Sequence, residues 1–585
     1  MIRNRIGRAL LILGLLLGLG TGVFVATAIA ATSTRGAGLV VATGLAPSDT
    51  RAAVRLDGSR VKDGGTLVIG VGSLDYIDPT LAVPFSGGST PAGLVWRSLT
   101  EATCALLFRY PVAAPPVVRY NLLPEVAAGY PALSHDGRTY TFTIRPGYRF
   151  STGAPVTAAS YAAAINRNLN PAMRSPAAQY LTDVVGAHAV QQGRAQTASG
   201  VKVAGNRLIV ELMRRVSDFP ARMTMANFCP VPVGLPADAE GARAPLPGSG
   251  PYYFAEFVRG SRAVLERNRF YRGPRAHHVE RFMVRIGDDR ELNTDKVETG
   301  EVDVDLGVPN GRVAELEAKY GVNKSRFFSI PATGMFYIYM NTQGPLFKHN
   351  AKLRQAVNFA IDRTALLAAL SPVKAGSSAS GTTADGYMPP GVPGSLDVHP
   401  YPLRHPDLKK AKALAGGHTR SGKAVWYACN DIGLGCLKVA ETVQANLKAI
   451  GIDVEIKSFP YTVKAAKTAT RGEPFDLVDD RFDVPWVDPS QYVKALLDGR
   501  TIRATGNTDM SYFNSAHYNA LIDGAERLSG RARSEAYGRL AADVAADAAP
   551  MAAMWTRKNR LFVSSHVGCV TAGVHALDLA GLCLK

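Results

Sequence analysis

Residues 334–363 read GMFYIYMNTQGPLFKHNAKLRQAVNFAIDR. The aromatic and apolar run 336–340 is typical of a β-strand, and a glycine–proline pair interrupts the chain after it. Apolar residues then recur at i, i+3, i+4, i+7 and i+8 from Leu353, which predicts a helix with Arg354 and Asn358 on its polar face. This stretch lies past the middle of a 585-residue chain. We therefore expect the chain to cross here from one large block to another.

Length and composition are those of a globular protein with more than one domain-sized core. The formal net charge is +18. The positive residues are scattered and form no aromatic–basic platform, so we expect no binding to nucleic acid. The alternative interpretation of the charge is a general, non-specific attraction to an anionic envelope or membrane surface.

The N-terminus has the three parts of an export signal. Basic residues precede the apolar run 9–30, which ends in the small-residue pattern Ala28-Ile29-Ala30. We interpret residues 1–30 as a signal peptide. Its apolar run could also span a bilayer if it were retained as an anchor. The first cysteine is Cys104, which excludes a lipid-modified N-terminal cysteine and predicts a protein that is not a lipoprotein.

Six cysteines in an exported chain indicate disulfides, although sequence alone allows many pairings. Spacing favours two local pairs and leaves a third by elimination: Cys429 with Cys436, Cys569 with Cys583, and Cys104 with Cys229. A metal site is disfavoured because the chain has no CxxC, and His277-His278 lacks a partner at ligand spacing. We expect no metal and no cofactor.

Strand and helix patterns alternate along most of the remaining chain. Residues 139–145 alternate apolar and polar side chains, which predicts a half-buried strand, and residues 158–168 follow as a helix. From 407 to 458 the order is helix, strand, helix, strand, which predicts an α/β lobe. Residues 31–62 are rich in small residues and are interpreted as a linker.

Short motifs in a fixed order carry a family resemblance, each of them weak alone. They are Gly64-Gly65-Thr66-Leu67, Asp78-Pro79, Leu123-Pro124-Glu125, Asp136-Gly137, Tyr140-Thr141-Phe142, Arg145-Pro146-Gly147, Gly153-Ala154-Pro155-Val156-Thr157, Gly248-Ser249-Gly250-Pro251-Tyr252, Gly300-Glu301-Val302-Asp303, the 353–363 run LRQAVNFAIDR, Phe475-Asp476 and Asp488-Pro489. Together, from about residue 64 to about 559, the chain resembles the extracytoplasmic solute-binding proteins of the oligopeptide/dipeptide/nickel class (family 5), which serve ABC importers.

The resemblance implies a two-lobed, periplasmic-binding-protein-like α/β fold with mixed sheets and an extra subdomain in lobe one. After the signal (1–30) and linker (31–62), the expected parts are lobe I at 63–104, its extra subdomain at 105–245, lobe I again at 246–335, lobe II at 336–553, and a return to lobe I at 554–585.

The resemblance also implies a function. The chain would bind a peptide between two lobes that close on it, work as a monomer, and dock on an ABC permease in the membrane. The alternatives within the class are a metal chelate, an opine-like compound or an oligosaccharide. Outside it, the alternatives are a secreted hydrolase and an envelope sensor or chaperone. Because neither G-x-S-x-G nor H-E-x-x-H occurs, we expect no enzyme.

Residues 475–491, FDLVDDRFDVPWVDPSQ, are the predicted ligand segment. A buried carboxylate beside an aromatic ring suits an ammonium group, and the alternative is a solvated acidic loop. Family members often place an aspartate here against a peptide's ammonium, but Pro485 occupies that position, so Asp483 takes the role in our prediction. The full set of predicted ligand contacts is Asp483, Trp486, Asp488, Phe482, Tyr337, Tyr339, Phe85 and Trp555. The aromatic residues among them could equally be core.

Overall fold

The computed structural model describes residues 61, 63–81, 91–112, 120–241, 244–370, 381–431, 435–571, 574 and 577–585. The signal and almost all of the linker expected from the sequence, as well as Phe85, lie outside these residues. Within them, no helix combines the length and the apolar character needed to cross a bilayer.

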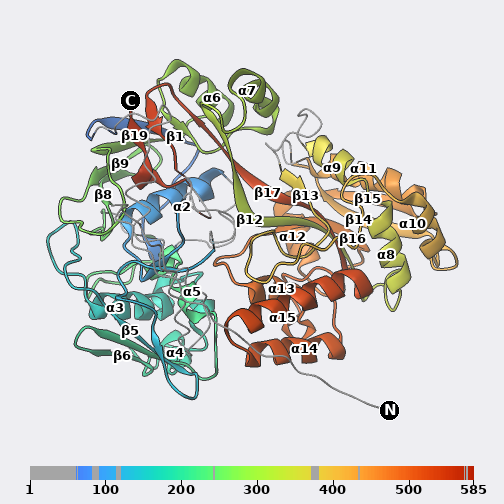
Figure 1. Cartoon of the computed structure of the whole chain (residues 1–585), viewed down its shortest axis with the longest axis horizontal. Helices are drawn as coiled ribbons and strands as arrows, with labels where there is room; N and C mark the ends of the chain where they lie inside the picture. Colours follow the sequence, from blue (N-terminus) through green and yellow to red (C-terminus); the bar gives the residue numbers. More distant parts are fainter. Residues whose placement is uncertain are drawn as a thin grey trace, which may run out of the picture. The chain divides into compact units, whose positions relative to one another are not determined.

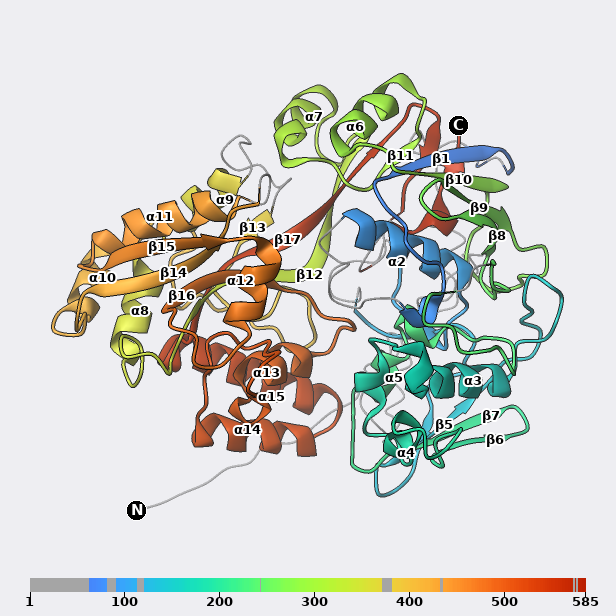
Figure 2. The same ribbon diagram turned by 180° about the vertical axis from the view of Figure 1, so that it is seen from behind.

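One large mixed sheet runs through the described chain (Figures 1 and 2). In order across the sheet, its strands are β15 (Asp453–Phe459), β14 (Lys423–Cys429), β16 (Leu477–Phe482), β12 (Phe327–Met340), β17 (Met551–Val563), β11 (Val304–Asp305), β1 (Thr66–Val71), β10 (Arg281–Ile286), β9 (Arg262–Arg267) and β8 (Tyr252–Val258), with β13 (Gly381–Thr383) paired to β17. Strand β1 runs parallel to β10 and β11, and β14 runs parallel to β15 and β16. The other pairs are antiparallel.

The two long central strands belong to both halves of this sheet. Antiparallel pairing of β12 with β17 extends from Phe327 opposite Phe562 to Tyr339 opposite Met551. At one end β17 also pairs with β11, and at the other end β12 pairs with β16. Two separate apolar cores flank them, one around β1, β9 and β10 and one around β14 and α8. The fold is therefore two-lobed. We call the β8–β11 side lobe one and the β14–β16 side lobe two.

Helices flank the strands along the described chain. They are α2 (Pro91–Thr103), α3 (Ala158–Leu169), α4 (Ala187–Gln191), α5 (Phe219–Arg222), α6 (Arg290–Thr299), α7 (Val313–Tyr320), α8 (Ala351–Ala360), α9 (Arg363–Leu370), α10 (Leu408–Ala415), α11 (Cys436–Lys448), α12 (Tyr461–Thr468), α13 (Pro489–Leu497), α14 (Ala516–Arg527) and α15 (Gly530–Asp543).

The predicted amphipathic helix of the 334–363 stretch is α8, and its apolar face is buried as expected. Its polar face differs from the prediction, because Arg354 and Asn358 are buried as well. Arg354 donates to the Ala548 carbonyl at 2.7 Å, and Asn358 donates to the Met551 carbonyl at 3.1 Å. These bonds satisfy buried polar groups and tie α8 to the start of β17.

A smaller antiparallel sheet forms the extra subdomain, with α3, α4 and α5 beside it (Figures 1 and 2). Its strands, in order, are β4 (Ala132–Leu133), β5 (Thr139–Thr143), β7 (Arg207–Glu211) and β6 (Val201–Ala204). Tyr140 and Phe142 of β5 are buried, as their alternation with polar residues predicts. We call this part the small-sheet subdomain. The exact domain boundaries expected from the sequence stay a prediction.

Three disulfides join the two pairs of cysteines that the spacing favoured and the third pair that was left by elimination. Cys104 at the end of α2 bonds to Cys229 after α5, which links lobe one to the small-sheet subdomain. A second bond, Cys429 to Cys436, closes the turn from β14 to α11. The third, Cys569 to Cys583, joins the antiparallel pair β18 (Val567–Cys569) and β19 (Cys583–Leu584) near the C-terminus. A further two-stranded pair is formed by β2 (Phe108–Arg109) and β3 (Leu123–Pro124).

Candidate functional site

The predicted ligand segment, residues 475–491, runs from β16 through a loop into α13. Strand β16 lies between β14 and β12, so its start belongs to the core of lobe two. Asp488 caps α13, because its carboxylate accepts a hydrogen bond from the Ser490 backbone N–H at 2.9 Å. Pro489 follows at the first helical position, where a missing N–H costs nothing. The loop between these two fixed ends carries Asp483 and Trp486.

Two of the five acids in this segment are paired inside lobe two. Asp479 and Asp480 are buried, and the ammonium nitrogen of the buried Lys464 on α12 lies 3.5 Å from Asp479 and 3.9 Å from Asp480. Burial raises the pKa of Asp479, while Lys464 opposes that rise. The Lys464 ammonium group pairs with both carboxylates in the interior of lobe two, where it compensates one of their two negative charges. We therefore assign these residues to the structure of lobe two.

Asp483 lies against the long central strands. Its Oδ2 atom is 3.5 Å from Arg481 Nε and 3.5 Å from Arg557 Nη1, which extends from β17. On β12, Gly334 leaves the space for this carboxylate, because a Cβ at that position would lie 2.0 Å from Asp483 Oδ1. In the described structure, Asp483 thus contacts two guanidinium groups. Its predicted role opposite a ligand ammonium stays a prediction.

Trp486 connects the loop of lobe two to the small-sheet subdomain. Its indole N–H donates to Asp218 Oδ2 at 3.0 Å, and Gln491 of α13 donates to the same oxygen at 3.3 Å. The Arg222 guanidinium lies 5.2 Å from the centre of the Trp486 ring, and the Tyr180 ring meets it edge-on at 5.0 Å. The indole is thus held by hydrogen-bond, cation–π and aromatic contacts at once.

One further hydrogen bond supports this junction. The Val487 backbone N–H donates to the Tyr110 hydroxyl at 2.8 Å, and Tyr110 follows β2. Burial raises the pKa of Tyr110 well above its ordinary value, so the hydroxyl stays protonated and available as an acceptor. Consecutive residues of the loop, Trp486 and Val487, therefore contact two different elements outside lobe two.

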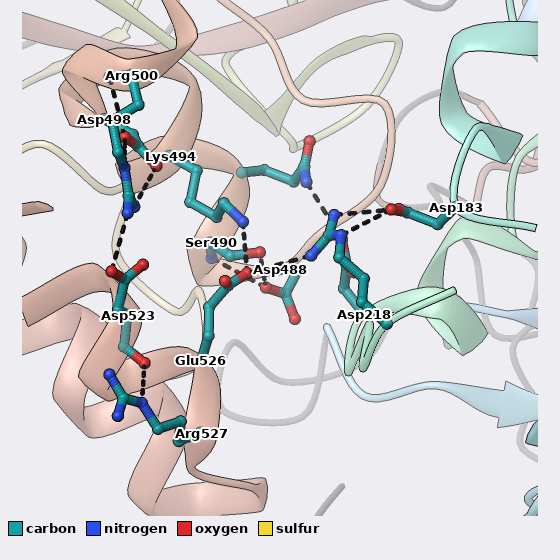
Figure 3. Close-up of polar contacts among 12 residues, drawn as sticks. Asp183, Asp218, Asp488, Ser490, Lys494, Asp498, Arg500, Asp523, Glu526 and Arg527 are labelled. Atoms are coloured by element: carbon teal, nitrogen blue, oxygen red, sulfur yellow. Dashed lines mark hydrogen bonds and ion pairs between the residues drawn. The ribbon is translucent and has the colours of Figure 1, made fainter. Parts of the chain in front are cut away.

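A cavity of about 250 Å³ lies beside Trp486 and is lined mostly by charged and polar side chains. Figure 3 shows polar contacts around this cavity, with α13 and its neighbours on one side and Asp183 and Asp218 on the other. The charged residues of the lining are Asp183, Arg214, Arg215, Asp218, Arg222, Lys494, Glu526 and Arg533.

Most of these charges are paired with each other. Arg222 contacts Asp183 and Asp218 at 3.2 Å each. Lys494 pairs with Glu526. Arg533 instead donates two hydrogen bonds of 2.9 Å to Asp488, the capping residue of α13. The walls of the cavity are therefore held by an ion-pair network, which fixes side-chain positions.

Phe85 lies outside the described residues, and the other remaining predicted contacts are core side chains. Tyr337 and Tyr339 on β12 are buried against each other, and the Tyr337 hydroxyl donates to the Tyr387 carbonyl at 2.8 Å. Phe482 packs edge-on against the Tyr492 ring, and Trp555 of β17 stacks on Phe336 at 4.8 Å. Asp483, Trp486 and Asp488 are near one another in sequence but contact different partners, and Trp555 lies on a different strand. Their contact with a ligand stays a prediction.

The structure adds residues that sequence patterns did not single out. Asp218 and Arg222 come from the small-sheet subdomain, and Arg557 comes from the polar run Thr556–Arg560 of the central strand β17. The signal for Arg557 was present, since an arginine in a buried central strand needs a charged partner. Among the described residues, no group of three or more His, Cys, Asp or Glu side chains is placed to hold a metal ion.

Comparisons with known proteins agree with this architecture. Residues 121–503 match the model of the bacterial extracellular solute-binding proteins, family 5 Middle. The chain belongs to this family. Proteins of the family are extracytoplasmic solute-binding proteins, which matches the class expected from the sequence.

Individual members of family 5 are distant relatives of this chain. It is 25% identical over 350 residues to the glutathione-binding protein GsiB of Pectobacterium atrosepticum, a match that covers 58% of the chain and 62% of the relative. It is also 25% identical over 346 residues to the oligopeptide-binding protein OppA of Bacillus subtilis, covering 56% and 62%. The chain thus spans less than two thirds of the length of these curated relatives.

A solved structure described as clavulanic acid biosynthesis oligopeptide binding protein 2 has the same fold. It superposes with a TM-score of 0.79 at 23% sequence identity, and the match covers 92% of this chain and all of that chain. The likeness confirms the two-lobed α/β architecture for this family 5 protein.

Proposed function

We propose that this family 5 protein is the extracytoplasmic binding component of an ABC importer and holds a peptide between its two lobes. It works as a monomer, delivers the peptide to a permease in the membrane, and carries out no catalysis. Residues 1–30 direct its export and are either cleaved or kept as an anchor at the outer face of the membrane.

The observation that carries the proposal is the set of contacts across the junction at Trp486. In this loop of lobe two, the Trp486 side chain donates a hydrogen bond to Asp218 of the small-sheet subdomain. The Val487 backbone N–H donates a second one to the Tyr110 hydroxyl. Contacts of this kind can form and break as a unit when two lobes open and close about connecting strands. The long strands β12 and β17 supply that connection.

Two lines of support favour a peptide over the other solutes of the class. The relatives GsiB and OppA are named for glutathione and oligopeptides. In addition, the segment 475–491 offers charged and aromatic groups together, which suits a ligand with charged ends and an apolar body. We propose Asp483 and Trp486 as contacts, with Asp488, Phe482, Tyr337, Tyr339, Phe85 and Trp555 forming or supporting the walls.

Native mass spectrometry of the purified protein, followed by thermal-shift screening with di- to pentapeptides, tests this function. We expect a co-purified peptide mass or a raised unfolding temperature with a subset of the peptides, because a ligand that binds only the folded state stabilises it. Peptides recovered after incubation should be intact. Absence of any bound mass and of any shift across the library would refute the peptide proposal, and cleaved peptides would refute the assignment as a non-enzyme.

A further inference from the structure

Basic side chains are concentrated at the outer end of lobe two. Helices α8 and α10 pack against each other there, at the end of lobe two opposite lobe one (Figures 1 and 2). The Asp407 backbone N–H donates to the Phe359 carbonyl at 3.0 Å, and the Asn350 side chain donates to the His418 carbonyl at 2.8 Å, so the two helices run antiparallel. We call six exposed residues of these helices and their flanking turns the basic end: Lys348, Lys352, Lys409, Lys410, Lys412 and Arg420.

The turn after α10 and the start of α8 form one continuous part of the basic end. Arg420 donates hydrogen bonds to the Pro345 and Lys348 carbonyls, the latter at 2.6 Å. Its guanidinium therefore lies against the turn that precedes α8. Lys352 follows four residues after Lys348, in the first turn of α8.

The lysines of α10 are not placed to stabilise their helix. Ala411 and Ala415 are its buried positions, and the helical period puts Lys409 and Lys412 on the opposite, exposed side. These two lysines are neighbours at i and i+3, where like charges repel each other. Lys409 and Lys410 also lie in the first turn, where the helix dipole favours acids over cations. Helix stability therefore does not account for this arrangement.

The charges of the basic end lack acidic partners. None of its six side chains forms an ion pair with an acid of the described part of the chain. The neighbouring acid in the chain, Asp407, caps α10 by accepting a hydrogen bond from the Lys410 backbone N–H at 3.0 Å. On lobe one, by contrast, the exposed Lys319 pairs with Glu298 at 2.8 Å. The basic end therefore presents a strongly positive surface, which attracts anionic partners.

An exposed apolar side chain lies within the same surface. Leu408 begins α10 and is 37% exposed, directly before Lys409 and Lys410. On a lipid surface, lysines meet the anionic headgroups while a leucine enters the apolar layer beneath them. A soluble polyanion would also neutralise the lysines but would leave the leucine in water. The leucine therefore favours a membrane as the partner.

We propose that the basic end of lobe two docks on an anionic lipid membrane. Lysines are compact, mobile point charges, and six cations spread over two helices suit the diffuse charge of many headgroups. The export signal expected at residues 1–30 would bring the folded protein to the outer face of a membrane. The inference does not rest on the proposed peptide-binding function, because no residue of the basic end belongs to the candidate site.

Sedimentation with lipid vesicles tests the docking. The protein is used without residues 1–30, because the apolar run 9–30 could insert by itself and each buried apolar cluster of the described chain begins at Leu67 or later. Vesicles of phosphatidylcholine alone are compared with vesicles that contain about 30% phosphatidylglycerol, at about 0.05 M and about 0.5 M salt. We expect binding to the anionic vesicles only, and binding at least about tenfold weaker at the higher salt.

Glutamine variants assign the binding to the basic end, with circular dichroism to confirm folding. The test variant removes three charges from α10: Lys409→Gln, Lys410→Gln and Lys412→Gln. The matched control removes three exposed charges from the small-sheet subdomain and lobe one: Lys202→Gln, Lys319→Gln and Lys324→Gln. We expect the test variant to bind anionic vesicles about 10- to 100-fold more weakly, because each lysine near the surface contributes about fivefold. The control should change binding by less than about threefold.

Leu408→Ser distinguishes a membrane from a soluble polyanion. This variant should bind anionic vesicles about 3- to 10-fold more weakly, since less apolar surface enters the lipid. Its binding to soluble polyglutamate should equal that of the unchanged protein. Vesicle binding that ignores Leu408→Ser, together with polyglutamate binding as tight as vesicle binding, would assign the basic end to a soluble polyanion and overturn the membrane proposal.

Two further results would overturn it. Absence of binding to anionic vesicles at the lower salt would show that lobe two does not dock on lipid. An equal loss of binding in the test variant and the control would show that net charge alone, rather than the basic end, attracts the protein to lipid. Both results leave the peptide-binding proposal standing, because peptide binding is measured in solution without lipid.

Discussion

Asp488 illustrates how a residue chosen as a ligand contact can also hold the fold. Both of its oxygens bond to Arg533 at 2.9 Å, and the two side chains are only 13% and 8% exposed. Asp488→Asn would leave the Arg533 guanidinium buried without its main counter-charge. We expect a loss of about 3–5 kcal/mol in stability, the usual cost of breaking a buried pair, measured as a lower midpoint of urea unfolding.

The matched control makes the same chemical change on the surface. Glu535→Gln removes a carboxylate whose partner, Arg531, is 82% exposed, and it should alter stability by less than about 1 kcal/mol. If both variants lost the same free energy of unfolding, the buried pair between Asp488 and Arg533 would stabilise the fold no more than an exposed pair does.

Asp509 makes stability depend on pH. It is buried, and burial raises its pKa to about 7 although Ser511 and Phe513 donate hydrogen bonds to it. Between about pH 4 and pH 7 the folded protein therefore keeps a proton that the unfolded chain has lost, so stability falls as pH rises through this window. A shift of about three pKa units corresponds to at most about 4 kcal/mol.

The variant Asp509→Asn tests this linkage because its side chain stays neutral. We expect its unfolding midpoint, followed by circular dichroism, to fall less than that of the unchanged protein between about pH 5 and pH 7.5. Parallel pH profiles for the two proteins would show that Asp509 is ionised in the folded state throughout.

At the scale of residues, the sequence points to one side of the candidate site and gives no sign of the other. Asp483 and Trp486 are recognisable because acids and aromatic rings crowd into one short segment. Asp218 and Arg557 were not, because they are far from the loop in sequence and meet it only through tertiary packing. The charge balance around a buried side chain depends on residues that are far from it in sequence, and a local sequence pattern does not contain them.

At the scale of elements, β12 differs from its prediction in length. The sequence indicated a strand at 336–340, whereas β12 spans Phe327–Met340. Pro331 and Gly334 discourage a strand assignment, and in the structure they fall at an irregularity where the register to β17 shifts. By contrast, α8 was predictable, since its period is set by the apolar face alone.

Gly334 lies in this irregular part of β12 and leaves room for the Asp483 carboxylate. An added Cβ would lie 2.0 Å from Asp483 Oδ1 and 2.9 Å from Asp483 Cγ, so Gly334→Ala must displace that carboxylate from Arg481 and Arg557. We expect ligand affinity, measured by calorimetry, to fall roughly 3- to 10-fold, the scale of a weakened polar contact. Gly311→Ala, at a position with no heavy atom within 4 Å, should bind as the unchanged protein does. Unaltered binding by Gly334→Ala would mean that Asp483 can move without consequence.

At the scale of the whole molecule, the two lobes are joined in two different ways. The strands β12 and β17 connect them through backbone pairing along most of their length. The contacts at Trp486 connect lobe two to the small-sheet subdomain through side chains, which can separate. Affinity for an enclosed ligand then depends on how strongly the separable contacts favour the closed arrangement.

Trp486→Phe tests that dependence, because it keeps an aromatic ring but removes the N–H that donates to Asp218. A hydrogen bond to a charged group stabilises by about 1.5–3 kcal/mol, so the closed arrangement becomes less favourable. We expect the ligand to dissociate about 10- to 100-fold faster in stopped-flow measurements. Trp426→Phe is the control: Trp426 is buried in lobe two, and its N–H has no hydrogen-bond partner among the described residues. That variant should lose stability through the smaller ring while its dissociation rate stays the same. Equal rates for all three proteins would show that the Trp486 contact does not govern closure.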